Sequence, residues 1–192
     1  MRPSLLPLAA VLMLVACVGS GLANGFREDL RALATGRIAE IVSSPQVVEA
    51  VRAQNTETAA FGQERIDELD RTWRAEAESA EQPMIDAVME RPLSLYLAGV
   101  QDASQGLFTE IFVTDARGLN VGQSRVTSDY WQGDEAMWQD TISGGPGAID
   151  IGALVEDDST LTVQSQVSVP VIDPESGQVI GAATFGVNVE RL

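Results

Sequence analysis

The stretch Glu110–Gly118, with the sequence EIFVTDARG, has the pattern of a strand that runs into a tight turn. Its first half is rich in β-branched and aromatic residues, which favour strands. Asp115 and Gly118 then stand at the first and last positions of a tight turn, where these residue types are common. Residues 119–124 follow as a returning strand. The stretch therefore predicts an antiparallel hairpin made of residues 107–113 and 119–124.

The chain beyond this hairpin continues the pattern of strands and turns. Residues 148–154 form a short predicted strand, and residues 161–169 alternate apolar and polar side chains as a half-buried strand does. Residues 173–177 are a predicted turn, and residues 179–189 are the last strand. Residues 128–145 interrupt the pattern with a loop and a short helix. Together these elements predict one antiparallel sheet of five strands.

The chain before the hairpin, residues 26–104, has helical periodicity. Apolar side chains recur every three or four positions. Ser44 is placed to cap a helix. Trp73 and Tyr96 lie on apolar helical stripes and are predicted core residues. Three prolines suit the first turn of new helices: Pro45, Pro83 and Pro92. The predicted fold class is α+β, with long N-terminal helices packed on the antiparallel sheet.

The first 23 residues have the pattern of an export signal. Arg2 is the only charge before Arg27, residues 5–18 are almost all apolar, and small residues follow to Ala23. The apolar run is shorter than the ~20 residues that span a bilayer. Cys17 ends a sequence that looks like a bacterial lipobox, so lipidation of Cys17 is the alternative to cleavage after Ala23. We expect a periplasmic or secreted protein or, by the second route, a lipoprotein anchored through Cys17.

Removal of residues 1–23 leaves one predicted domain, residues 24–192, with a helical part (24–105) and a sheet part (106–192). The only cysteine is Cys17, so the domain has no disulfide and depends on its apolar core. All basic residues are arginines, and eleven of the twelve remain after export to face 28 acidic residues. The resulting charge, 11 − 28 = −17, disfavours binding to nucleic acid and to anionic membranes.

The missing residue types remove whole classes of enzyme chemistry. Without histidine the chain has no Ser-His-Asp triad and no imidazole zinc site. Without lysine it forms no Schiff base and has no phosphate-binding P-loop. Only carboxylate chemistry or a carboxylate metal site remains, and no calcium-loop spacing is present. We therefore expect neither an enzyme nor a cofactor.

Several segments of the chain resemble Cache domains, the PAS-like (PDC) extracellular sensor family. Residues 110–118 are similar to the first hairpin of those domains, and residues 128–138 (SDYWQGDEAMW) to the segment that they place over the ligand pocket. Residues 165–171 and 181–189 are similar to their last two strands. The resemblance covers nearly all of the mature chain and is strongest over residues 107–189.

The resemblance implies a sensor domain that binds a small molecule. In such proteins the domain usually lies between two transmembrane helices and feeds a kinase, a cyclase or a chemotaxis module. This chain ends at Leu192, directly after the last predicted strand. We therefore expect a free-standing periplasmic Cache protein without its own transmembrane helix or output domain.

The candidate site is the aromatic segment after the hairpin. Tyr130, Trp131 and Trp138 are three of ten aromatic residues, and Asp129, Asp134 and Glu135 lie among them. A helix that starts near Gly133 puts Asp134 and Trp138 on one face. Aromatic walls with a few polar groups suit a small organic ligand. The competing interpretation is that these aromatics are core residues and that Asp134 only caps its helix.

Two charge patterns leave the ligand class open. Asp129 and the neighbouring carboxylates suit a cationic amine, held by ion pairing and by cation–π contact. Arg125, turned inward, suits a carboxylate or an amino acid instead. Gln166 is a further candidate on the polar face of its strand. The predicted ligand-binding residues are Arg125, Asp129, Tyr130, Trp131, Trp138 and Gln166, with no catalytic or metal-binding residue.

Three functions are consistent with these patterns. The first is a small-molecule-binding sensor module that passes its ligand, or its ligand-bound shape, to a partner. The second is an interaction protein with a vestigial pocket that docks on a membrane receptor. The third is a carboxylate-based hydrolase that uses Asp129, Asp134 or Glu135 as acid and base. A screen for ligands separates the first two, and turnover assays test the third.

Overall fold

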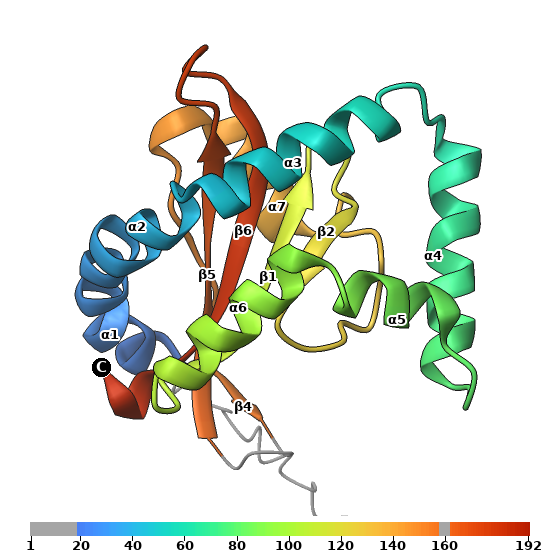
Figure 1. The fold of residues 1–192 in the computed structure, drawn as a ribbon. Helices are drawn as coiled ribbons and strands as arrows, with labels where there is room; N and C mark the ends of the chain where they lie inside the picture. Colours follow the sequence, from blue (N-terminus) through green and yellow to red (C-terminus); the bar gives the residue numbers. More distant parts are fainter. Residues whose placement is uncertain (1–18, 158–161) are drawn as a thin grey trace, which may run out of the picture.

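A six-stranded antiparallel sheet lies at the centre of the computed structural model, which describes residues 19–157 and 162–192 (Figure 1). The strand order is β2-β1-β6-β5-β3, and β4 also pairs with β5. The sheet confirms the predicted antiparallel arrangement, except that the predicted strand 148–154 shortens to two residues (β3) and a further short strand (β4) follows it. The strands are β1 (Phe108–Asp115), β2 (Asn120–Gln123), β3 (Asp150–Ile151), β4 (Val155–Asp157), β5 (Thr162–Ile172) and β6 (Val179–Asn188).

The predicted hairpin β1–β2 is present, and Asp115 organises its turn. Its buried carboxylate accepts hydrogen bonds from the backbone N–H groups of Arg117 (2.8 Å) and Leu119 (3.0 Å). It also accepts from Gln54 Nε2 (3.1 Å) and Thr58 Oγ1 (2.8 Å) of α3. The aspartate that defines the turn in the sequence therefore also fixes a helix to the sheet.

Three helices of the N-terminal half begin at prolines, as predicted. Pro45, Pro83 and Pro92 each occupy the first turn of a helix, where the missing N–H costs no hydrogen bond. Ser44 lies at the N-cap position, but its side chain makes no capping hydrogen bond, so that part of the prediction is wrong. The helices are α1 (Gly19–Leu33), a π-helical turn (Ala34–Ile38), α2 (Ala39–Val42), α3 (Pro45–Thr58), α4 (Gln63–Ala77), α5 (Pro83–Met89) and α6 (Pro92–Ala103).

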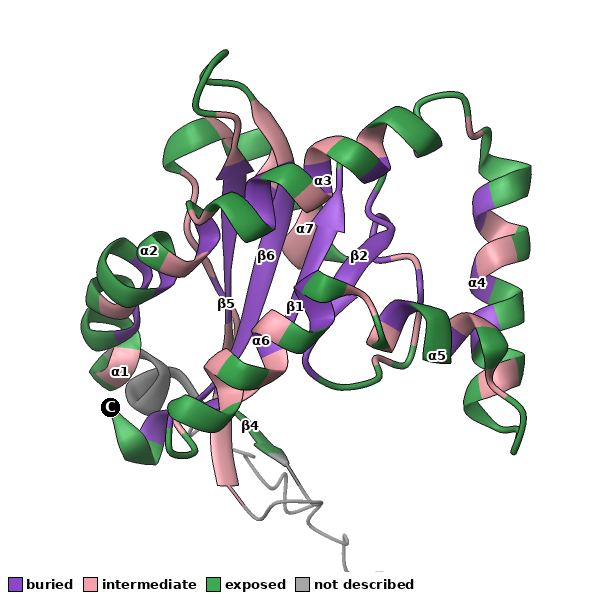
Figure 2. Ribbon diagram, in the orientation of Figure 1, coloured by how far each residue is buried: buried purple, intermediate pink, exposed green. Residues whose placement is uncertain are grey.

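One face of the sheet carries the main apolar core. Helices α1, α2, α3 and α6 cover this face, and their inner sides are buried against it (Figures 1 and 2). The longer strands β1, β5 and β6 contribute alternate residues, as in the series Val167, Val169 and Val171 on β5. Tyr96 packs at the margin of this core, in agreement with its predicted role. We call this side of the sheet the apolar face.

A second, smaller core holds α4 and α5. Trp73, which is fully buried as predicted, stacks on Tyr130 with 5.4 Å between the ring centroids. Ile66 of α4, Ile85 and Val88 of α5, and Leu119 complete the cluster. These two helices pack on the segment after β2 and stand to one side of the sheet, on the right of Figure 1. The prediction that the helices pack on the sheet therefore holds for the main core, whereas α4 packs on the segment after β2.

The opposite face of the sheet is covered by α7 (Ala136–Gly144), which packs on β3, β5 and β6 and lies behind the sheet in Figure 1. This helix begins at Ala136, three residues later than the start near Gly133 that the sequence predicts. Residues 132–135 form a turn first, because Glu135 N–H donates to the carbonyl of Gln132 (3.1 Å). Asp134 is therefore outside the helix, and the prediction that it shares a helical face with Trp138 is wrong.

The predicted signal peptide falls largely outside the described residues, as does Cys17. Helix α1 begins at Gly19, within the stretch that the sequence assigned to the exit of the signal peptide. Within residues 19–157 and 162–192, no helix is both long enough and apolar enough to cross a membrane.

Candidate functional site

The predicted aromatic segment is fixed to α4 by one buried carboxylate. Asp70 Oδ1 accepts hydrogen bonds from the backbone N–H groups of Tyr130 and Trp131, both at 3.0 Å. Its other oxygen accepts from Arg74 Nε (2.7 Å), and Arg74 also reaches Asp129 (2.9 Å). Asp129 is thus already paired with an arginine, which neutralises the carboxylate that the sequence offered to a cationic ligand.

Tyr130 and Trp131 are structural aromatics in this arrangement. Tyr130 is 5% exposed, and burial raises the pKa of its hydroxyl, opposed by the nearby guanidinium of Arg91. Trp131 is half-buried, and its Nε1 donates to the carbonyl of Arg117 (2.8 Å) in the hairpin turn. The two rings therefore belong to the small core, as the competing interpretation expected. A role in ligand binding stays a prediction for both.

Arg125 and Gln166 lie away from these aromatics. Arg125 is exposed and lines a pocket of about 400 Å³ with Thr109, Asn188 and Arg191, at the end of the sheet where β1 begins. Gln166 Nε2 donates to Glu110 Oε1 (3.1 Å), on the face of the sheet that α7 covers. The structure thus does not bring the six predicted residues together into one site.

Trp138 is the predicted residue whose surroundings point to a ligand. It lies on α7, and its Nε1 is buried with no hydrogen-bond partner among the described residues. Thr141, one turn further along α7, is fully buried, and its Oγ1 likewise has no partner there. A buried donor without a partner costs about 1–3 kcal/mol, so two on one helix require an explanation.

The sheet beneath α7 is polar. Ser168 of β5 and Thr184 of β6 are cross-strand partners, and Thr184 Oγ1 donates to Ser168 Oγ (3.1 Å). Ser168 is 0% exposed and Thr184 4%. Thr114 of β1 lies on the same face and donates to the carbonyl of Ala182 (3.2 Å). We call this side of the sheet, with α7 over it, the polar face.

Two carboxylates border the polar face. Asp150 of β3 is the cross-strand partner of Ser168, so its side chain is on the same side of the sheet. Burial raises the pKa of Asp150, the negative charge of Asp140 on α7 raises it further, and Arg27 opposes both. The site is therefore electrostatically suited to a group that carries positive charge.

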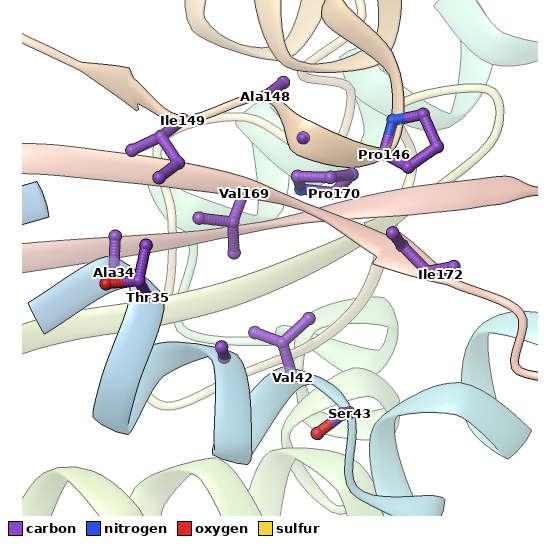
Figure 3. Close-up of a pocket in the computed structure, with 12 residues that line it drawn as sticks. Ala34, Thr35, Val42, Ser43, Pro146, Ala148, Ile149, Val169, Pro170 and Ile172 are labelled. Atoms are coloured by element: carbon purple, nitrogen blue, oxygen red, sulfur yellow. The ribbon is translucent and has the colours of Figure 1, made fainter. Parts of the chain in front are cut away.

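A pocket of about 380 Å³ opens at the edge of β5, beside the end of α7 (Figure 3). One wall is the π-helical turn and α2, with Ala34, Thr35, Ala39 and Val42. The other wall is residues 146–149, and Val169, Pro170 and Ile172 of β5 form the base. Pro170 suits this edge because a proline has no N–H to leave unpaired. The volume is within the range of small-molecule pockets.

The most informative residues of this site were not predicted from the sequence: Asp140, Thr141, Asp150, Ser168 and Thr184. The alternation of residues 161–169 predicts a strand with one face in water, but in the structure α7 packs over that face. Within residues 19–157 and 162–192, no cluster of three or more carboxylate, cysteine or histidine side chains is arranged to hold a metal ion.

No protein-family model matches the chain, and no curated protein matches its sequence. Solved structures do match. The V. cholerae histidine kinase DctB sensor domain is 13% identical, with 88% of this chain and 57% of that chain covered and a TM-score of 0.39. The E. coli DcuS sensor domain is 19% identical, with coverages of 67% and 89% and a TM-score of 0.36. The matched structures are Cache sensor domains.

A third match is the ligand-binding domain of the Campylobacter jejuni chemoreceptor Tlp3 in complex with 4-methylisoleucine. It is 12% identical, with 89% of this chain and 62% of that chain covered and a TM-score of 0.38. This chain spans about three fifths of the length of most of these domains. The elements of this chain, helices on one antiparallel sheet, agree with the predicted fold class.

Proposed function

We propose that this chain is a periplasmic, sensor-type module that binds a small molecule between α7 and the polar face of the sheet. The observation that carries this proposal is the pair of buried, unpartnered groups on α7, Trp138 Nε1 and Thr141 Oγ1. A ligand that accepts a hydrogen bond from each group removes the cost of leaving them unpaired. The ligand-bound position of α7 is then the signal that a membrane receptor or another partner reads.

The charges around α7 select an amine or another ammonium compound. Asp150 is disfavoured as an anion by burial and by Asp140, and a bound ammonium group compensates both effects. The indole ring of Trp138 offers a cation–π face in addition to its N–H donor. An ammonium compound that also has an oxygen acceptor can pair with Asp150 and accept hydrogen bonds from Trp138 and Thr141.

The pocket at the edge of β5 supplies the entrance. Residues 146–149, which line it, follow α7 directly, and Pro170 lies on the strand that α7 covers. Ala39 is an exposed wall residue on α2, so a larger side chain there narrows the pocket without replacing a core residue. The Ala39→Leu variant therefore tests access separately from recognition.

The decisive experiment is a thermal-shift screen of amines, amino acids and carboxylates with the wild-type chain and two matched valine variants. Thr141→Val removes the unpartnered hydroxyl, so it should raise stability by about 1 kcal/mol and abolish the ligand-induced shift. Thr114→Val removes a hydroxyl that is hydrogen-bonded on the same face, so it should lower stability by about 1 kcal/mol and keep the shift.

Two outcomes reject the proposal. One is that no compound in the panel shifts the wild-type melting temperature, which favours the docking protein with a vestigial pocket. The other is that a compound stabilises wild type and Thr141→Val equally. Calorimetry with Trp138→Phe then checks the second donor, since this change keeps an aromatic ring and removes the N–H together with the five-membered part of the indole.

A further inference from the structure

A second pocket, of about 550 Å³, lies between α3 and the start of α6 on the apolar face of the sheet. It therefore lies on the opposite side of the sheet from α7. Its walls are partly apolar, with Ala50 and Ala53 from α3 and Pro92, Leu93 and Val121 opposite. The charged side chains that line it are Glu49, Glu57 and Arg91. We call this pocket the α3–α6 groove.

Arg91 is held in the groove by neutral groups. Its Nη1 donates to Gln54 Oε1 (2.8 Å) and to the carbonyls of Val121 (2.9 Å) and Asn120 (3.4 Å). The hydroxyl of Tyr130 is a further neutral neighbour. In the part of the chain that the structure describes, no carboxylate lies within ion-pair distance of this half-buried guanidinium.

This lack of a counter-ion is unusual in a chain with 28 acidic residues. A half-buried charge is normally paired, since an unpaired one loses hydration without compensation. The carboxylate of Asp115 is close by, but it is already saturated by Gln54, Thr58 and two backbone N–H groups. The guanidinium has five N–H donors, more than its neutral acceptors use, and its planar geometry matches a carboxylate.

The α3 wall carries the complementary charge. Glu49 and Glu57 are exposed residues of α3 that both line the groove. Glu57 and Arg91 line the same pocket, and the charges of both influence the pKa of Tyr130. The groove is thus lined by one cation, by two carboxylates on the α3 wall and by apolar side chains.

We propose that the α3–α6 groove binds a small zwitterion with an apolar body. The carboxylate of the zwitterion pairs with Arg91, its ammonium group pairs with Glu57 and Glu49, and its apolar part contacts Ala50, Ala53 and Leu93. A simple anion is a poorer ligand, because the two glutamates repel it. This site goes beyond the proposed function and lies on the other face of the sheet.

The test is isothermal titration calorimetry on the full chain with L-alanine, L-valine and L-leucine, up to about 10 mM, the weak end of the affinity scale. For the best of these, the amide lacks the carboxylate and the deaminated acid lacks the ammonium group. Each analogue should bind at least about tenfold more weakly, because each loses one charged contact. Failure of all three amino acids to bind overturns the proposal.

Variants then locate the bound zwitterion. Ala53→Leu fills the groove at an exposed helical position and should weaken binding at least about tenfold with an unchanged melting temperature. Arg91→Lys keeps the charge, loses the planar fork and should weaken binding by a similar factor. Glu57→Gln should weaken the amino acid but strengthen the deaminated acid, which a purely structural role does not predict.

Controls separate this site from the space under α7. Ala39→Leu and Thr141→Val change the first site and should leave the affinity of the groove unchanged. If these two variants abolish amino-acid binding while Ala53→Leu does not, the amino acid binds under α7 and the groove proposal is wrong. If Ala53→Leu alone abolishes binding, the amino acid binds in the α3–α6 groove. This conclusion does not depend on whether the proposed function is correct.

Discussion

The two faces of the sheet are built from the same strands but with opposite chemistry. On β5, Val167 and Val169 join the apolar face, whereas Ser168 between them joins the polar face. Helices cover both faces, so the difference does not reflect exposure to water (Figure 2). One face therefore buries apolar area, whereas the other buries hydroxyl groups that need hydrogen-bond partners.

The apolar face should carry most of the folding energy. Phe185 of β6 is fully buried and packs on Phe108 with 5.1 Å between the ring centroids. We predict that Phe185→Ala lowers the free energy of unfolding by about 3–5 kcal/mol, because it leaves a large cavity in a closely packed core. Urea denaturation followed by circular dichroism measures this. A loss below about 1 kcal/mol would show that the apolar face does not carry most of the folding energy.

Substitutions on the polar face should lower the free energy of unfolding less than Phe185→Ala does. The effects of the two hydroxyl groups there should also be coupled. We predict that Ser168→Ala or Thr184→Val alone costs about 1–2 kcal/mol, since each leaves its partner hydroxyl short of a hydrogen bond. The double variant should cost no more than the worse single variant, because both members of the pair are then gone. A double-mutant cycle from urea melts measures the coupling. Strictly additive losses would show that the two hydroxyls do not act as a pair.

The fold could be predicted from local chemistry. The turn at Asp115–Gly118 and the prolines that open α3, α5 and α6 act over a few residues, so the sequence alone locates them. The start of α7 was predicted too early, because the turn made by Gln132 and Glu135 replaces the first helical residues. Neither residue has a strong signal for this turn.

The candidate site was less accessible to such reasoning, because its partners are distant in sequence. The ring of Tyr130 stacks on Trp73, and the carboxylate of Asp129 forms an ion pair with Arg74. Both partners belong to α4, and the sequence around residues 129 and 130 does not indicate this. Thr141 looks like any other helical threonine until α7 is packed on the sheet. Trp138 was found because aromatic residues are rare in this chain, and its ligand role is still a prediction.

The smallest expected effect concerns Asp150, at the border of the polar face. Burial and Asp140 raise its pKa above the ordinary carboxyl value of about 3.9, so the folded state holds the proton more tightly than the unfolded state does. Such a group destabilises the folded state when it is ionised. The penalty is absent below the unfolded pKa, and it grows as the pH rises through the folded pKa.

We therefore predict that Asp150→Asn raises the free energy of unfolding at pH 7 by less than about 1 kcal/mol, since the group is only partly buried. The gain should vanish by about pH 3, where the wild-type carboxyl is protonated. Urea melts at a series of pH values measure both limits. A variant that is less stable than wild type at pH 7 would mean that the attraction of Arg27 outweighs burial. A different outcome is that Asp150→Asn is more stable than wild type and also loses the thermal shift that ammonium compounds induce. In that case Asp150 lowers the stability of the folded state and is needed for binding, unlike the residues of the apolar face.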